Sequence, residues 1–272
     1  MEDPTLLLTL LALLLAIGAF AGVIAGLLGV GGGIVLVPAF FFTFEQLGYG
    51  SPQLMQVCLA TSLATIIVTS VRSVLAHNRK GAVDWAILRA WGPWIAAGAV
   101  LGMALASQLR STTLQIIFGV LALIAGLYMA FGRADWRLGP QMPGGVTRTG
   151  LGGALGFFSV LMGIGGGTFG VPLMSLYSLP IHRAVATAAG FGLIIALPSV
   201  LGFLLLDIAV KPPFTVGAVN LPAFAVIIAM TLITTPLGVR LAHAMDPRPL
   251  KRAFAVFILV VALNMLRKAA GW

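Results

Sequence analysis

Charged residues are scarce in this chain. Of its 272 residues only 8% are Asp, Glu, Lys or Arg, and 60% are hydrophobic, whereas a soluble domain carries about 25% charged residues. So few charges cannot cover a water-exposed surface, which excludes a soluble globular domain. Several apolar runs approach or exceed the roughly 20 residues that a membrane-spanning helix needs. We therefore predict an all-α integral membrane protein that crosses the bilayer several times.

Cysteine is almost absent as well. Cys58 is the only one, so neither an intrachain disulfide nor a cysteine-based metal site can form. The three histidines, His77, His182 and His243, are scattered without the spacing of metal ligands. No kinase, hydrolase or dinucleotide-binding motif is present. We expect no metal, no cofactor and no enzymatic activity, although an enzyme that needs only backbone and hydroxyl groups stays open.

Acidic residues are few: seven Asp and Glu stand against sixteen Lys and Arg, which gives a net charge of +9. The basic residues lie between apolar runs, where loop Lys and Arg set the orientation of a membrane protein. No basic face with interleaved aromatic residues is present, as nucleic-acid binding would require. We expect a multi-pass protein of the cytoplasmic (inner) membrane. Its expected partner is the lipid bilayer, and we expect no binding of nucleic acid.

The start of the chain, Met-Glu-Asp-Pro, is acidic. A secretory signal peptide begins with a positively charged region instead. We therefore expect the first apolar segment to be retained as a helix whose acidic start lies outside the cell.

The apolar segments fall into two series separated by one polar stretch. The first series is Thr5–Leu28, Ile34–Phe44, Pro52–Ala76, Trp85–Ala106 and Thr112–Phe131, and the second is Gly150–Met162, Thr168–Leu179, His182–Leu206, Val219–Ala242 and Leu250–Leu266. These limits predict a first membrane repeat over residues 1–131, a cytoplasmic linker over 132–149 and a second membrane repeat over 150–272.

One pattern is present in both series. Gly29-Val30-Gly31-Gly32-Gly33, followed by Pro38, returns as Gly163-Ile164-Gly165-Gly166-Gly167, followed by Pro172. We call residues 29–38 the first glycine box and residues 163–172 the second glycine box. Glycine triplets followed by proline break a helix, and broken helices at membrane depth are tolerated only inside protein or beside water. Two matched breaks indicate the substrate site of a transporter.

The two halves align beyond the glycines. At an offset of 136, Gly81-Ala82-Val83-Asp84 matches Gly217-Ala218-Val219-Asn220, and at an offset of 126, Ala60-Thr61 matches Ala186-Thr187. The glycine boxes are offset by 134, so the first half has a longer loop around residues 45–51. The sequence therefore predicts two homologous four-segment halves, each with a Gly-broken or re-entrant helix.

The distribution of positive charge bears on the relative orientation of the halves. If the second half is inverted, 12 of the 16 Lys and Arg lie on the side of residues 72–89, and if the halves are parallel, 10 do. Because loop Lys and Arg gather on the cytoplasmic side, the count favours inverted repeats.

The glycine boxes supply candidate anion-binding groups. A helix that begins just after Gly33 or Gly167 leaves its first N–H groups unpaired, and these donors with the positive end of the helix dipole attract an anion. Glycine also lets a ligand approach the backbone closely. The candidate glycines are Gly31, Gly32, Gly33, Gly165, Gly166 and Gly167. The alternative is that the glycines serve close helix packing.

Four hydroxyls join the candidate site. Thr61 and Thr187 follow the boxes at similar distances and are matched between the halves, and Ser62 and Thr168 are weaker candidates. Each hydroxyl could donate to an anion, or it could bond back to a carbonyl of its own helix.

Asp84 is a candidate for proton coupling, but its position favours another role. Its counterpart is Asn220, and both precede a predicted helix. Since Asp and Asn are both good N-caps, we predict that the two residues cap helices.

The paired boxes, together with Ala-Thr-Ser at 60–62, Gly-Ala-Val-Asp-Trp at 81–85 and His-Arg-Ala-Val-Ala-Thr at 182–187, resemble the TauE/SafE sulfite-exporter family of membrane permeases. The resemblance covers essentially the whole chain. It implies transport of sulfite, sulfoacetate or a related small sulfur-containing anion. One departure is that Ala188 stands where the first half has Ser62, so a contact made by that hydroxyl has no counterpart.

Together these features predict a secondary transporter that exports a small sulfur-containing oxyanion by alternating access. No ATP-binding element is present, so a gradient of substrate or of a coupling ion, proton or sodium, would supply the energy. An anion channel and a non-transporting membrane assembly subunit are the alternatives. The sequence leaves the anion, the direction, the coupling ion and any homo-oligomer undetermined.

Overall fold

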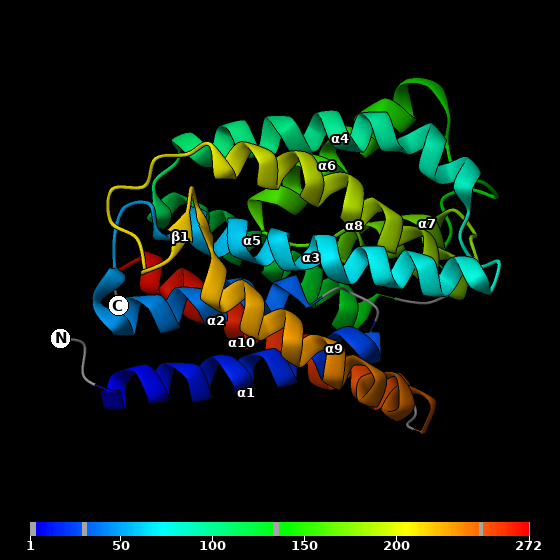
Figure 1. The fold of residues 1–272 in the computed structure, drawn as a ribbon. Coiled ribbons are helices and arrows are strands. Elements are labelled where there is room, and N and C mark those ends of the chain that lie inside the picture. Colours follow the sequence, from blue (N-terminus) through cyan, green and yellow to red (C-terminus); the bar gives the residue numbers. More distant parts are fainter. Residues whose placement is uncertain (1–3, 29–31, 133–135, 245–246, 272) are drawn as a thin grey trace.

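A computed structural model describes residues 4–28, 32–132, 136–244 and 247–271. Its elements are helical apart from one two-stranded hairpin (Figure 1). In chain order they are α1 (Pro4–Leu28), α2 (Gly33–Phe44), the π-helix η1 (Glu45–Tyr49), α3 (Leu54–Arg79), α4 (Trp85–Gln108), α5 (Ser111–Phe131), α6 (Gly145–Leu161), α7 (Gly167–Leu176), α8 (Ile181–Leu204), β1 (Thr215–Val216), β2 (Val219–Asn220), α9 (Leu221–Ala244) and α10 (Pro247–Ala269).

Five of the described helices are long and apolar enough to cross a membrane: α3, α4, α5, α8 and the Leu221–Gly238 part of α9. Large apolar side chains on the outside of the bundle are more than half exposed, among them Leu101, Ile124, Leu201, Ile233 and Val260. A surface of this kind suits lipid, and helices satisfy their own backbone hydrogen bonds there. The chain is therefore an all-α, multi-pass membrane protein, as its composition predicted.

The helices pack in pairs that draw one member from each half. Helix α3 packs against α8 in the interior, α5 against α10, α1 against α9, and α4 against α6. The short helices instead pack within their own halves, α2 on α3 and α7 on α8. Helices α1–α5 of the first half correspond in order to α6–α10 of the second half. Under this correspondence the α1–α9 pair matches the α6–α4 pair, the α2–α3 pair matches the α7–α8 pair, and the α3–α8 and α5–α10 pairs match themselves. This is the pattern expected of two related halves.

The two short helices end at opposite ends of the bundle (Figure 1). After α2 the chain reaches Glu45, which pairs with Lys268 near the end of α10. After α7, Leu176 accepts a hydrogen bond of 2.7 Å from the backbone N–H of Leu138, in the segment that joins the halves. Each glycine box therefore turns its chain back toward the end of the bundle from which it came.

Three local features differ from the sequence-based expectation. Helix α6 begins at Gly145, inside the segment predicted as a linker. The longer loop of the first half contains the short segment η1, whose helical path is broken at Gly48, with φ 84°. Residues 215–220 form a small hairpin in which Thr215 pairs with Asn220. None of these features follows from the spacing of apolar residues, on which the predicted limits rest.

Candidate functional site

The two glycine boxes meet in the interior of the bundle. Gly33 begins α2, and a Cβ added to it would lie 2.7 Å from the carbonyl oxygen of Gly163 and 3.2 Å from Oγ of Ser62. The Ser62 hydroxyl donates a hydrogen bond of 2.7 Å to that same Gly163 carbonyl. The structure thus brings Gly33, Ser62 and the second glycine box together, whereas Gly31 lies outside the described residues.

Both boxes separate two helices through a glycine in the left-handed region, but at different positions. Gly32 has φ 73° and precedes α2, while Gly163 has φ 61° and follows the end of α6. Residues with a side chain rarely adopt this conformation, so glycine is required at both positions. Gly166, the counterpart of Gly32, has an ordinary helical φ of −63°, so the two breaks are not identical.

Close packing accounts for part of the second box. A Cβ on Gly166 would lie 2.3 Å from Cβ of Phe191 and 2.7 Å from the carbonyl oxygen of Ala188, both on α8. The neighbouring Gly165 is less confined, because its nearest contact would be the Cγ2 methyl of Ile66 at 3.3 Å. The packing interpretation thus explains Gly166, while Gly165 needs another reason for its identity.

The matched threonines have matched partners that the sequence did not indicate. Oγ1 of Thr61 accepts a hydrogen bond of 3.0 Å from the backbone N–H of Asn220. Oγ1 of Thr187 accepts one of 3.0 Å from the backbone N–H of Asp84. Each threonine is fully buried and holds the start of a long helix in the opposite half. Each hydroxyl keeps its own hydrogen for donation, so anion binding by these residues remains a prediction.

We expect Thr61→Val and Thr187→Val to lower stability by about 1–3 kcal/mol each, because each change leaves a backbone N–H without its acceptor. The loss should be larger for Thr61→Val, since the bond to Asn220 is buried and the bond to Asp84 is only partly buried. Thermal unfolding of the purified protein measures both effects. Serine in place of either threonine keeps the acceptor and should recover most of the loss. Equal melting temperatures for wild type and the valine variants would contradict these assigned bonds.

Asp84 and Asn220 are helix caps, as the sequence predicted. Oδ1 of Asp84 accepts a hydrogen bond of 3.1 Å from the N–H of Ile87 at the start of α4. Oδ1 of Asn220 accepts one of 3.0 Å from the N–H of Ala223 at the start of α9. Asp84 also forms an ion pair of 2.8 Å with Arg183, whose side chain is 49% exposed. These contacts give Asp84 a structural role at the surface of the bundle.

Thr168 stands out among the candidates because its hydroxyl has no partner. It is the second residue of α7 and is 8% exposed, and its Oγ1 is buried without a hydrogen bond. Oγ of Ser159, near the end of α6, is in the same state. Buried polar atoms are nearly always hydrogen-bonded. A donor left free at the N-terminus of a helix therefore points to a ligand, and the repeat could not have revealed Ser159 because its counterpart is Ala25.

The interior around the boxes is neutral. The described buried polar residues are all Ser, Thr, Asn or Gln, and no Lys, Arg, Asp or Glu is among them. The described residues also contain no group of His, Cys, Asp and Glu that could hold a metal ion, and Cys58 is fully buried. The groups available for chemistry are therefore hydroxyls and backbone N–H groups, which bind ligands but do not titrate.

The sequence of the chain is similar to those of a known family of membrane proteins. The family model described as sulfite exporter TauE/SafE matches residues 14–265. A probable membrane transporter protein of Haemophilus influenzae is 29% identical over 263 residues, which are 96% of this chain and 99% of that protein. A probable membrane transporter protein of Methanocaldococcus jannaschii is 27% identical over 270 residues, covering 95% and 96% of the two chains. No solved structure matches. The likeness spans both glycine boxes.

Proposed function

Because the chain belongs to the TauE/SafE sulfite-exporter family, whose members compared above are named membrane transporters, we propose that it exports a small sulfur-containing oxyanion across the cytoplasmic membrane. Sulfite, sulfoacetate and related organosulfonates are the proposed substrates. The family supports transport as the general activity. The choice of a sulfur oxyanion follows the family description together with the donor groups in the interior.

The observation that supports this proposal most is the unpartnered hydroxyl of Thr168. It lies in the first turn of α7, where the N–H groups of Gly167 and Thr168 have no acceptor within the helix. A sulfite or sulfonate oxygen would accept from the hydroxyl and from these N–H groups, and the helix dipole favours the negative charge. The ligand would then satisfy a donor that the protein leaves free.

A neutral site suits a transporter of anions. A fixed cation at membrane depth is costly, and it would hold an anion too tightly for release. Backbone N–H groups and hydroxyls offer partial charges instead. In this proposal Gly32, Gly33 and Gly165 allow the backbone to approach the anion, and the hydroxyls of Thr61 and Thr187 donate to it. Ser62, whose hydroxyl donates to the Gly163 carbonyl, and Gly166, which packs on α8, keep the helices around the anion in place.

We further infer that the halves are inverted repeats that move against each other. Two observations support this inference: helices pair between the halves, and α2 and α7 end at opposite ends of the bundle (Figure 1). Inversion places 12 of the 16 Lys and Arg on one side of the membrane, which the positive-inside rule assigns to the cytoplasm. Rocking of one repeat against the other would open the contact between Gly33 and Gly163 to each side in turn.

A counterflow experiment tests the proposal. Vesicles that contain the purified protein and a high internal concentration of unlabelled sulfoacetate should take up labelled sulfoacetate transiently, and the rate should saturate with concentration. Sulfite should compete for uptake, whereas taurine, which carries an ammonium group in place of the carboxylate of sulfoacetate, tests how the site treats a zwitterion. Flux without saturation or counterflow would indicate a channel. Absence of flux for every anion would instead support an assembly subunit.

A further inference from the structure

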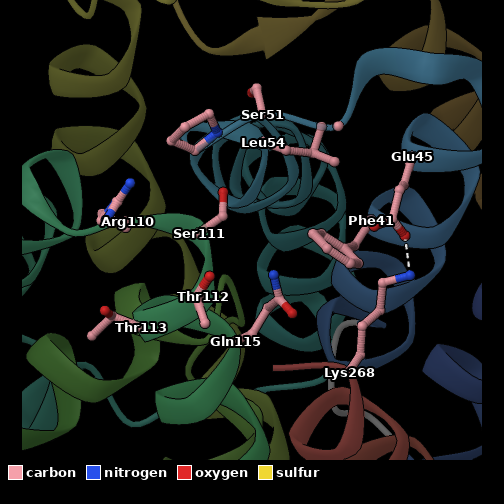
Figure 2. Close-up of a pocket in the computed structure, with 12 residues that line it drawn as sticks. Phe41, Glu45, Ser51, Leu54, Arg110, Ser111, Thr112, Thr113, Gln115 and Lys268 are labelled. Atoms are coloured by element: carbon pink, nitrogen blue, oxygen red, sulfur yellow. Dashed lines mark ion pairs between the residues drawn. The ribbon is translucent and has the colours of Figure 1, made fainter. Parts of the chain in front are cut away.

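A cavity of about 670 Å³ with both polar and apolar walls lies at the end of the bundle where α3 and α5 begin and α10 ends. Its lining includes Arg110, Ser111, Thr112, Thr113, Gln115 and Lys268. Figure 2 shows Arg110 and Lys268 on opposite sides, with Ser111, Thr112 and Gln115 between them. None of these six residues belongs to the site at the glycine boxes.

The start of α5 leaves donors open to this cavity. Arg110 occupies the N-cap position without a capping bond from its side chain. The N–H of Ser111 is bound by the carbonyl of Pro52 at 2.7 Å, and the N–H of Leu114 by the carbonyl of Arg110 at 3.1 Å. Only the N–H groups of Thr112 and Thr113 in this first turn therefore have neither a helical nor a capping partner.

Gln115 provides an independent sign of a ligand. Its side chain lines the cavity and is 6% exposed. Across the described residues its amide makes no hydrogen bond. The amide has no partner among these residues and is therefore free to bind a ligand in the cavity, and Gln115 lies one turn beyond the open N–H groups of α5. The helix and the side chain thus present donors to the same space.

The charges around the cavity favour an anion. Arg110 is exposed at its rim, and Lys268 pairs with Glu45 while lying 5.8 Å and 5.5 Å from the ring centres of Phe41 and Phe42. The two cations and one carboxylate leave a net charge of +1. Since Glu45 already neutralises Lys268, Arg110 is the cation that remains for a ligand.

We propose that this cavity is a second binding site for a small oxyanion, held by the N–H groups of Thr112 and Thr113, the amide of Gln115 and the guanidinium of Arg110. The proposal rests on the proposed function in taking a sulfur oxyanion as the ligand. Eight residues of α3 separate Leu54, at the cavity, from Ser62, at the glycine boxes, which is roughly 12 Å at 1.5 Å per residue. The site would hold the anion before or after it crosses the central contact.

Calorimetric titration of the purified full-length protein with sulfite, and separately with sulfate, tests this site. Arg110→Gln should weaken binding about tenfold or more, because it removes a charge-assisted hydrogen bond, and Gln115→Leu should weaken it several-fold. The matched control is Lys211→Gln, which removes a cation at the same end of the bundle without touching the cavity and should bind like wild type. Titrations repeated in a Thr168→Val background separate this site from the central one.

Transport measurements distinguish failure of this site from failure of the proposed function. Arg110→Gln should raise the half-saturating concentration for counterflow and leave the maximal rate near that of wild type. Wild-type affinity in both Arg110→Gln and Gln115→Leu would overturn the second site while leaving transport intact, as would absence of binding in a wild-type protein that shows counterflow. If wild type binds through Arg110 but shows no flux, the site stands and the transport proposal fails.

Discussion

Replacing Thr168 with valine is expected to reduce sulfoacetate counterflow about 10- to 100-fold at low substrate concentration, without lowering the melting temperature. Valine keeps the shape of the side chain and removes only the hydroxyl, which has no partner in the protein. A hydrogen bond to a charged group contributes roughly 1.5–3 kcal/mol, and each 1.4 kcal/mol is about tenfold in affinity. Proteoliposome flux and thermal unfolding measure the two effects.

The same change at another buried threonine provides the control. Thr231 on α9 is 5% exposed, and its hydroxyl donates to the carbonyl of Ile228 in its own helix at 3.1 Å. Thr231→Val should therefore leave flux unchanged and alter stability only slightly. If Thr168→Val transported like wild type, or lost stability together with flux, its hydroxyl would have a structural partner in place of a ligand, and the proposed central site would be wrong.

Local sequence signals predicted the helices and their caps well. The long apolar runs gave the spanning helices within a few residues, because hydropathy depends only on neighbouring residues. Asp84 and Asn220 were predicted as caps from their place before an apolar run. The side chain of each accepts the expected hydrogen bond from the backbone N–H three residues later. The glycine boxes were predicted to interrupt helices, and α6 ends at Leu161, just before the second box, while α7 begins at Gly167 within it.

Contacts between the halves could not be predicted in the same way. The partners of Thr61 and Thr187 lie 159 and 103 residues away, and nothing local distinguishes a threonine that accepts a distant N–H from one that binds a ligand. The match between the halves showed only that Thr61 and Thr187 have equivalent roles, and it did not show what that role is. The cavity beside Gln115 was likewise hidden, because it forms where the beginnings of α3 and α5 meet the end of α10.

The glycine boxes show the same limit at the level of single residues. Gly165 and Gly166 are adjacent and identical in sequence, yet Gly165 faces the Cγ2 methyl of Ile66 at 3.3 Å, while Gly166 faces the Cβ of Phe191 at 2.3 Å and a backbone carbonyl. Only the packing of α7 on α8 separates them. Substitutions at neighbouring positions of the second glycine box therefore test different properties. A substitution of Gly166 tests the packing of α7 on α8 and does not test anion binding directly.

Gly166→Ala should accordingly destabilise the protein strongly, by about 3 kcal/mol or more, since overpacking a filled core typically costs 1–3 kcal/mol and the contacts here are with atoms that cannot rotate away. The added methyl would lie 2.3 Å from Cβ of Phe191 and 2.9 Å from the backbone nitrogen of Gly192. Relief requires α7 to move off α8. The expected result is a large fall in melting temperature and a loss of the monodisperse fraction in size-exclusion chromatography.

Gly165→Ala is the matched control, because it adds the same methyl one residue earlier in the same box. Its nearest contact, Cγ2 of Ile66 at 3.3 Å, ends a side chain that can shift by a few tenths of an ångström, and the next, Cα of Gly192, lies at 3.7 Å. The cost should stay below about 1 kcal/mol, within the range of tolerated core changes.

Phe191→Leu should not rescue Gly166→Ala, since leucine keeps the Cβ that causes the clash. Equal stability of the two alanine variants would mean that α7 does not pack on α8 as described, and the argument that places Thr168 in a buried first turn would fail with it.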